Sequence, residues 1–521
     1  MHFHSGLQES SRQPAGRIVY SHAMMTATET PPASERLARQ TEVVQALSQH
    51  LPGHTLLWQS EETTPYECDG LTAYRQRPLV VALPETYAQV QAVLQVCHRL
   101  QVPVVARGAG TGLSGGAMPH AMGVTLSLAK FNKILDVNPL SRTARVQCGV
   151  RNLAISEAAA PHGLYYAPDP SSQIACTIGG NVAENSGGVH CLKYGLTVHN
   201  LLKVEILTVE GERMVLGSDA LDSPGFDLLA LFTGSEGMLG IVTEVTVKLL
   251  PKPQVAKVLL AAFDSVEKAG RAVGDIIAAG IIPGGLEMMD NLSIRAAEDF
   301  IHAGYPVDAE AILLCELDGV EADVHDDCAR VSEVLKLAGA TEVRLAKDEA
   351  ERVRFWAGRK NAFPAVGRIS PDYYCMDGTI PRRELPGVLR GIAELSEQFG
   401  LRVANVFHAG DGNMHPLILF DANQPGELER AEDLGGKILE LCVKVGGSIT
   451  GEHGVGREKI NQMCAQFNSD ELTLFHAVKA AFDPSGLLNP GKNIPTLHRC
   501  AEFGRMHIHN GELPFPELER F

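Results

Sequence analysis

Three histidines and a glutamate stand on glycine-rich segments near the end of the chain. His408 and His415 are seven residues apart in FHAGDGNMHPL, and Glu452 and His453 follow in GEHGVG. The intervening GDGN is typical of a tight turn, so we expect two strands that bring both imidazoles to one edge. Two histidines and a carboxylate with an open position can hold zinc or a similar divalent ion, with His453 beside it for proton transfer. The same spacing is also compatible with an ordinary turn histidine and an exposed Glu-His pair.

The overall composition narrows the class of protein. A chain of 521 residues is too long for one ordinary core, so we expect two or three domains. Acidic residues outnumber basic ones by 62 to 45, for a net charge of −17, and there is no long basic run. We therefore expect no nucleic-acid partner. Nor does any stretch reach the roughly eighteen uninterrupted apolar residues of a spanning helix, so no transmembrane segment is expected.

Cysteine spacing bears on redox chemistry. Eleven cysteines are scattered from Cys68 to Cys500 without a CxxC or CxxxC spacing. This pattern favours reduced thiols in a cytoplasmic protein and offers no local iron–sulfur motif. If electrons leave this protein through a cluster, another chain must carry it.

A glycine-rich loop in the first half offers a phosphate cradle. RGAGTGLSGG (107–116) follows a short apolar strand over 102–106 and contains a literal G-x-G-x-x-G. A dinucleotide-binding unit of the Rossmann type would need a helix after this loop, but the next element is another strand, over 123–128. We therefore expect backbone N–H groups of the loop to surround the anion.

Two further glycine-rich segments follow within about 150 residues. They are PDPSSQIACTIGGNVAENSGG (168–188) and GSEGMLGIVTEVTVKLLP (234–251), the second of which opens into the alternating pattern of a strand. Three such loops can wrap one long ligand that has phosphates in its middle.

After Pro253 the pattern changes. Val255–Phe263 reads as a strand, and 264–280 as a helix in which Asp264 and Glu267 have capping-box spacing. Further strands and helices alternate beyond it, which predicts a separate α+β cap.

The motifs RGAGTGLSGG, GGNVAENSGG, GSEGMLGIVTEVTVKLLP, HAGDGNMH, GEHGVGREK and NPGK together resemble one family. They resemble the FAD-linked 2-hydroxy acid oxidoreductases of the vanillyl-alcohol-oxidase superfamily, most closely the members that oxidise glycolate. The resemblance runs from about Thr63 to Phe521. It implies an α+β fold: a two-subdomain FAD-binding domain of the vanillyl-alcohol-oxidase type, an α+β cap domain and a C-terminal return segment.

The resemblance also sets the expected domain bounds. We expect an N-terminal extension over 1–60, partly disordered before about Pro32; an FAD-binding domain over 61–253; a cap and substrate domain with the metal site over 254–480; and a C-terminal segment over 481–521 that returns to the FAD domain and ends in a tail.

Site residues are carried over from the family position by position. The cofactor-binding residues expected for FAD are Arg107, Gly108, Gly110, Thr111, Gly112, Ser114, Gly115, Gly116, Gly179, Gly180, Asn181, Asn185, Gly187, Gly188, Glu236, Gly240, Ile241 and Asn489. The metal ligands expected are His408, His415 and Glu452, and the catalytic residues are His453 and Arg359.

The resemblance implies a reaction. We expect Arg359 to bind the substrate carboxylate, the metal to lower the pKa of the substrate hydroxyl, His453 to take the proton, and a hydride to pass to N5 of FAD. Relatives specific for 2-hydroxyglutarate carry Thr and Lys where this chain has Phe363 and Cys375. A small monocarboxylate is therefore expected, with oxidation of glycolate to glyoxylate as the reaction and D-lactate or another D-2-hydroxy acid as the alternative substrate.

The resemblance implies partners as well. Electrons are expected to pass to a second FAD-binding subunit and an iron–sulfur subunit, and through them to the quinone pool. The chain is then cytoplasmic and peripherally associated with the inner membrane through these partners. A hypothesis of another class is a flavin electron-transfer or assembly subunit whose metal is structural.

Overall fold

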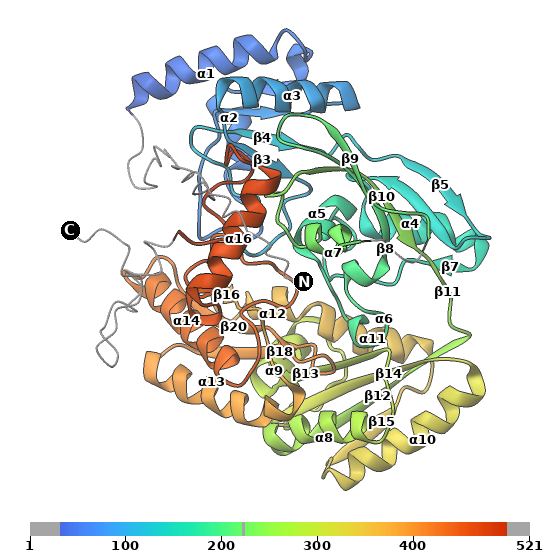
Figure 1. Ribbon diagram of the computed structural model, residues 1–521. Helices are drawn as coiled ribbons and strands as arrows, with labels where there is room; N and C mark the ends of the chain where they lie inside the picture. Colours follow the sequence, from blue (N-terminus) through green and yellow to red (C-terminus); the bar gives the residue numbers. More distant parts are fainter. Residues whose placement is uncertain (1–31, 221–224, 497–521) are drawn as a thin grey trace, which may run out of the picture.

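The structure is a computed structural model that describes residues 32–220 and 225–496. The predictions for the first thirty-one residues and for the tail beyond residue 496 fall outside this part of the chain. In Figure 1 the first half, blue to green, lies above the yellow to orange second half, and the red helix α16 returns to the upper half.

The first half begins with a small sheet. Its strand order is β1 (Leu56–Leu57), β2 (Val80–Ala82), β4 (Val124–Ser127) and β3 (Val104–Arg107). Helices α1 (Ala33–Leu47) and α3 (Tyr87–Leu100) pack on it, and α2 (Ser60–Thr63) lies between β1 and β2 in the chain. Strand β4 pairs in parallel with both β2 and β3, so the glycine-rich loop between β3 and β4 connects neighbouring parallel strands.

A second, antiparallel sheet completes the first half. Its order is β5 (Ile134–Asn138), β6 (Thr143–Gln147), β10 (Ile241–Lys248), β8 (Leu201–Leu207) and β9 (Arg213–Gly217). The connections contain α4 (Asn152–Ala159), α5 (Ile178–Glu184), α6 (Cys191–Tyr194), α7 (Leu228–Phe232) and the paired short strands β7 (Leu164–Tyr165) and β11 (Leu250–Pro251). Both sheets contribute to one continuous hydrophobic core.

The second half is built on a seven-stranded sheet. Its order is β15 (Glu342–Leu345), β12 (Val255–Phe263), β14 (Ala311–Gly319), β13 (Gly285–Asp290), β18 (Val403–Phe407), β20 (Pro416–Phe420) and β16 (Asp372–Cys375). The helices around it are α8 (Val266–Ala278), α9 (Asn291–Ile301), α10 (Glu321–Leu337), α11 (Glu349–Lys360), α12 (Ala362–Val366), α13 (Leu385–Phe399) and α14 (Glu427–Lys444). A two-stranded ribbon, β17 (Gly378–Thr379) with β19 (Asn413–Met414), and helix α15 (Met463–Gln466) complete it.

Strand β12 shows why helices cover both faces of this sheet. Successive side chains of a strand point to opposite faces. Leu259, Ala261 and Phe263 join the core under α8, α10, α13 and α14, whereas Leu260 and Ala262 join the core under α9, α11 and α12. A strand with both faces buried reads as a continuous apolar run, as VLLAAF does here.

Helix α16 (Ser469–Phe482) and the segment after it join the two halves. Leu472 packs in the core of the second half, and Phe482 packs against the core of the first. Beyond the helix, Leu488 forms a parallel bridge with Val104 of β3, which carries the chain back to the first sheet. The architecture is therefore the α+β arrangement with a return segment that the sequence predicts, while the exact domain bounds stay predictions.

Two local predictions are wrong. The cap of α8 is Ser265 rather than Asp264: the Ser265 side chain accepts from the Lys268 backbone N–H, and Asp264 instead pairs with the Lys268 ammonium at 2.8 Å. The second glycine-rich segment is not all loop, because the side chain of Thr177 caps the short helix α5 within it.

The described residues include ten of the cysteines and all the helices given above. Nine of the cysteines in the described ranges have free thiols, as predicted, but Cys464 is disulfide-bonded, so the prediction is wrong for that residue. Among the described helices none is both long and apolar enough to cross a bilayer.

We predict that helix α16 is attached to the second half through its buried side, which carries Leu472. Leu472 is 1% exposed and Leu474, two residues later in the same helix, is 63% exposed. Leu472→Ala should lower the free energy of unfolding by about 2–5 kcal/mol through the lost burial and the cavity left behind, and Leu474→Ala by less than about 0.5 kcal/mol. Denaturant unfolding of both variants measures this, and equal losses would contradict the observed docking of the helix.

Candidate functional site

A cavity lies where the two halves meet, with a volume of ≈ 1490 Å³ including the solvent at its open side. Its lining from the first half comes from the glycine-rich loop after β3, the segment around α5, and the residues that lead into β10. Five side chains of the second half close one end: Arg359, Phe363, His415, Glu452 and His453. The long part of the cavity is thus surrounded by backbone and small residues, and the closed end by groups that can do chemistry.

Glycines make the long part of the cavity possible. A Cβ atom on Gly108 would lie 2.3 Å from Oγ1 of Thr177, and one on Gly116 would lie 2.8 Å from Oε1 of Glu184. The contact at Gly108 leaves no room for a side chain beside Thr177, the N-cap of α5, and a side chain at Gly116 would force the Glu184 carboxylate to move. A cavity wall of close backbone with exposed N–H groups fits the phosphate-containing middle of FAD.

Eleven of the eighteen predicted cofactor-binding residues line this cavity. They are Arg107, Gly108, Gly110, Thr111, Gly112, Gly116, Gly179, Gly180, Asn181, Glu236 and Gly240. The other seven, Ser114, Gly115, Asn185, Gly187, Gly188, Ile241 and Asn489, are not part of the lining. Their roles in cofactor binding stay predictions.

Several residues outside the lining hold its walls in place. The Asn489 amide donates to the carbonyl oxygens of Gly116 and Glu236, at 3.0 and 2.7 Å. Ile241 is buried in the core of the first half. A Cβ on Gly187 would lie 2.7 Å from Oε2 of Glu452, so this glycine makes room for that carboxylate.

The predicted metal ligands come together at the closed end. His408 follows β18 directly and His415 lies between β19 and β20, so the antiparallel pairing of β18 with β20 brings them to one edge, as predicted. Nε2 of His408 and Nε2 of His415 lie 3.2 and 3.0 Å from the same oxygen, Oε1 of Glu452. Three ligand atoms within 4.8 Å of one another can surround a single ion.

Glu287 of β13, which sequence reasoning missed, fixes the tautomer of one ligand. Its carboxylate accepts from Nδ1 of His408 at 2.8 Å, and Nδ1 of His415 lies 3.3 Å from the carbonyl oxygen of Met376. With both Nδ1 atoms facing these oxygens, the two Nε2 atoms are left to bind a cation beside Oε1 of Glu452. Histidines whose Nδ1–H groups are held in this way are typical metal ligands, so the donor set fits a divalent metal ion.

Arg359, in the last turn of α11, is held by the same carboxylate. Its Nε donates to Oε2 of Glu287 at 2.8 Å, and the side chain is 2% exposed. Its Nη2 is buried and has no hydrogen-bond partner among the described residues. Since Arg359 lines the cavity, this free donor is available to a bound anion.

His453 stacks on His415, with ring centroids 4.9 Å apart and an angle of 8° between the planes. Burial lowers the pKa of His453 to about 4, so the imidazole is neutral near pH 7. Within the described chain its Nδ1 is buried without a hydrogen-bond partner. The ring therefore offers an unused nitrogen at the cavity wall.

Asp377, between β16 and β17, orients the whole loop that carries Glu452 and His453. It is fully buried and accepts from Oγ1 of Thr450 at 2.6 Å, Nδ2 of Asn413 at 2.8 Å, Nζ of Lys459 at 3.0 Å and the backbone N–H groups of residues 451–453. Burial alone would raise the pKa of Asp377, but Lys459 holds it well below its usual value. The only signal in the sequence was an aspartate next to a glycine after a strand, which reads as a turn.

We predict that Asp377→Asn is strongly destabilising. The change removes the carboxylate that lies 3.0 Å from the fully buried Lys459 ammonium and leaves it only the more distant Glu458 carboxylate, at 3.7 Å. Breaking a buried pair from one side costs about 3–5 kcal/mol of unfolding free energy. Denaturant unfolding measures the loss, and Asp372→Asn, on partly exposed β16, is the control with an expected loss below about 1 kcal/mol. Equal losses in the two variants would show that Asp377 does not organise the loop.

Comparison with known proteins agrees with this geometry. The family model "FAD binding domain" matches residues 78–217, and "FAD linked oxidases, C-terminal domain" matches residues 252–493. The chain is 81% identical over 481 residues to the glycolate oxidase subunit GlcD of Escherichia coli K12, covering 92% of this chain and 96% of the relative. It is 32% identical over 434 residues to a D-lactate dehydrogenase of Anaerostipes hadrus, covering 81% of this chain and 91% of the relative.

The fold agrees as well. The solved structure of p-cresol methylhydroxylase with bound substrate superposes with a TM-score of 0.75 at 18% identity, covering 88% of this chain and 98% of that one. This likeness confirms the predicted fold class, and the family models with the GlcD relative confirm the predicted resemblance. The chain therefore belongs to the FAD-linked oxidase family that contains the glycolate oxidase subunit GlcD, and it is an FAD-dependent oxidoreductase.

Proposed function

We propose that this chain is the catalytic flavin subunit of a glycolate-oxidising enzyme and converts glycolate to glyoxylate. The observation that carries the proposal is the closed end of the cavity. Arg359 and His453, each with a nitrogen unpaired in the described structure, line the cavity there, as do His415 and Glu452, two of the three convergent ligands. The name of the 81% identical relative, glycolate oxidase subunit, supports the choice of substrate.

Two groups would supply chemistry that the side chains lack. FAD, in the glycine-lined part of the cavity, supplies the acceptor for the hydride of the substrate. A divalent ion of the zinc type, held by His408, His415 and Glu452, supplies a Lewis acid that makes the substrate hydroxyl more acidic.

The side chains of the chain itself bind and deprotonate the substrate. Nη2 of Arg359 donates to the substrate carboxylate, while its Nε remains bound to Glu287, which limits the positions that the guanidinium can take. Nδ1 of His453 accepts the hydroxyl proton, since it is the unused nitrogen of a neutral ring. Because Glu287 contacts both Arg359 and His408, one carboxylate sets the spacing between the anion-binding donor and the metal ligands.

The walls of the closed end favour a small substrate. Phe363 lines the cavity with its ring centroid 6.4 Å from that of His415, and Cys375 is buried beside the same cluster. Neither side chain can pair with a second carboxylate, which supports a monocarboxylate. D-lactate differs from glycolate by one methyl group, and the D-lactate dehydrogenase relative supports it as the second candidate.

Electron transfer and location are part of the proposal. Reduced FAD passes its electrons to a second FAD-binding subunit and an iron–sulfur subunit, and through them to the quinone pool. In this proposal the chain is cytoplasmic and meets the inner membrane only through these partners. Support comes from the relative's name, which describes a subunit.

We predict that His453→Gln slows reduction of the flavin by glycolate by about 10²–10⁴-fold, the usual loss on removal of a general base. Anaerobic stopped-flow bleaching of the flavin absorbance measures the rate. His325→Gln, at an exposed position of α10, is the matched control and should bleach at the native rate. Bleaching at the native rate in both variants would remove His453 from the mechanism.

We also predict that chelation stops the bleaching and that added zinc or a similar divalent ion restores it, because the three ligands converge on one point. The same titration with D-lactate ranks the two substrates. A chelated protein that melts at lower temperature yet bleaches at the native rate would instead favour an electron-transfer or assembly subunit with a structural metal.

A further inference from the structure

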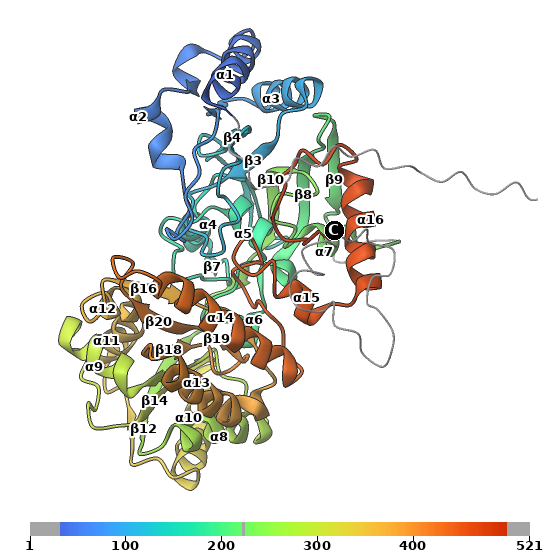
Figure 2. The same cartoon turned by 90° about the vertical axis from the view of Figure 1, so that its left-hand side faces the viewer.

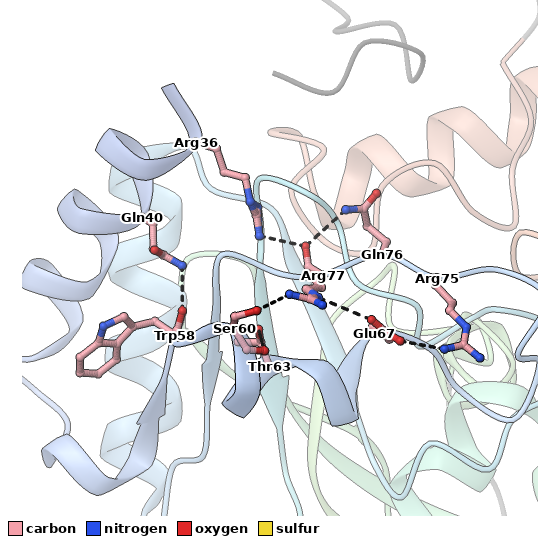
Figure 3. Close-up of a pocket in the computed structure, with 9 residues that line it drawn as sticks. All are labelled: Arg36, Gln40, Trp58, Ser60, Thr63, Glu67, Arg75, Gln76 and Arg77. Atoms are coloured by element: carbon pink, nitrogen blue, oxygen red, sulfur yellow. Dashed lines mark hydrogen bonds and ion pairs between the residues drawn. The ribbon is translucent and has the colours of Figure 1, made fainter. Parts of the chain in front are cut away.

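A second pocket lies in the first half and shares no lining residue with the flavin cavity. Its volume is ≈ 900 Å³, including its open mouth. Figure 3 shows it between helix α1, the short helix α2 and the loop that leads into β2. The proposed function makes no use of this pocket.

The pocket has an excess of positive charge. Arg36, Arg75 and Arg77 line it together with a single carboxylate, Glu67. Three guanidinium groups and one carboxylate leave two positive charges, on a chain whose net charge is −17. Because like charges in one pocket repel each other, a bound dianion would relieve the repulsion.

Arg36 is the arginine of this pocket whose guanidinium is held in place by backbone carbonyl oxygens. Its guanidinium donates to the backbone carbonyl oxygens of Ala121 and Pro78, both at 2.7 Å, so it is held without a carboxylate partner in the described chain. Burial and the neighbouring charge of Arg77 lower the pKa of Arg36. Figure 3 shows the Arg36 side chain directed at the backbone of Arg77.

Arg75 and Arg77 provide the free donors. Nη1 of Arg75 donates to Oε1 of Glu67 at 3.0 Å, Nη1 of Arg77 donates to Oγ of Ser60, and Nε of Arg77 lies 3.6 Å from Oε2 of the same Glu67 carboxylate. Within the described residues the Nη2 groups of both arginines have no hydrogen-bond partner. Their side chains are 63% and 46% exposed, so the free N–H groups face the open pocket.

We propose that this pocket binds a small phosphate monoester. The free Nη2 groups of Arg75 and Arg77 present N–H donors for two oxygens of a tetrahedral dianion. The Ser60 hydroxyl, which accepts from Arg77, keeps its own proton to donate to a third oxygen. The rest of the pocket, lined by polar side chains such as Thr63, leaves room for the esterified part of the ligand.

The test is isothermal titration calorimetry on the FAD-loaded protein, with inorganic phosphate and glycerol 2-phosphate as probes. Added chloride keeps the ionic strength constant during the titration. Otherwise the salt that each probe adds would itself screen the exposed charges and change the heat. The native protein should show saturable binding of one probe per chain. The double variant Arg75→Gln/Arg77→Gln should bind at least tenfold more weakly.

The control is Arg390→Gln, since Arg390 is an equally exposed arginine outside the pocket, at 59%. Retained flavin absorbance reports folding of each variant. If the double variant fails to fold, the single change Arg75→Gln, at the more exposed position, should still weaken binding at least threefold. No saturable heat with the native protein, or equal affinity in the native protein and the pocket variants, would overturn the proposal.

Discussion

The buried pair of Asp377 and Lys459 is the interaction on which the rest of the site depends. Taking two charges out of water is costly, and here the cost is offset because hydroxyl, amide and backbone donors surround the carboxylate. Those backbone donors belong to the loop of Glu452 and His453, so the charge pair positions the side chains proposed as metal ligand and base. The loop is rigid because its N–H groups are bound from within the protein.

A second set of carboxylates joins the halves of the molecule. Glu236, from the first half, accepts from the backbone N–H groups of Val455 and Gly456 at 2.7 and 2.8 Å. Glu287 links Arg359 to His408 inside the second half. Figure 2, turned by 90° from Figure 1, shows the same separation into an upper and a lower part. The contacts of Glu236 cross the boundary between these parts, so they hold the loop of Glu452 and His453 against the first half.

The sequence predicted the parts of the site that local chemistry determines. The turn GDGN predicted that His408 and His415 lie at the ends of neighbouring strands. The absence of a helix after the first glycine loop excluded a dinucleotide-binding unit of the Rossmann type. Glu287 and Asp377 were missed because their partners lie far away in the chain, although an acid inside the apolar strand GLEMMD was a usable signal. Helix α5 was missed because its paired glycines disfavour a helix, and tertiary packing against Cys148 overrides that preference.

The return of the chain to β3 has a consequence for biosynthesis. Leu488 and Asn489 pair with the backbone of Val104, and Asn489 also binds the wall of the flavin cavity through Gly116. The ribosome makes the glycine loops early and these last contacts some 370 residues later, whereas most domains fold as soon as they emerge. The nascent flavin-binding half must therefore remain incomplete until residue 489 has been made, and a chain that stops before that residue loses this support of its cofactor cavity.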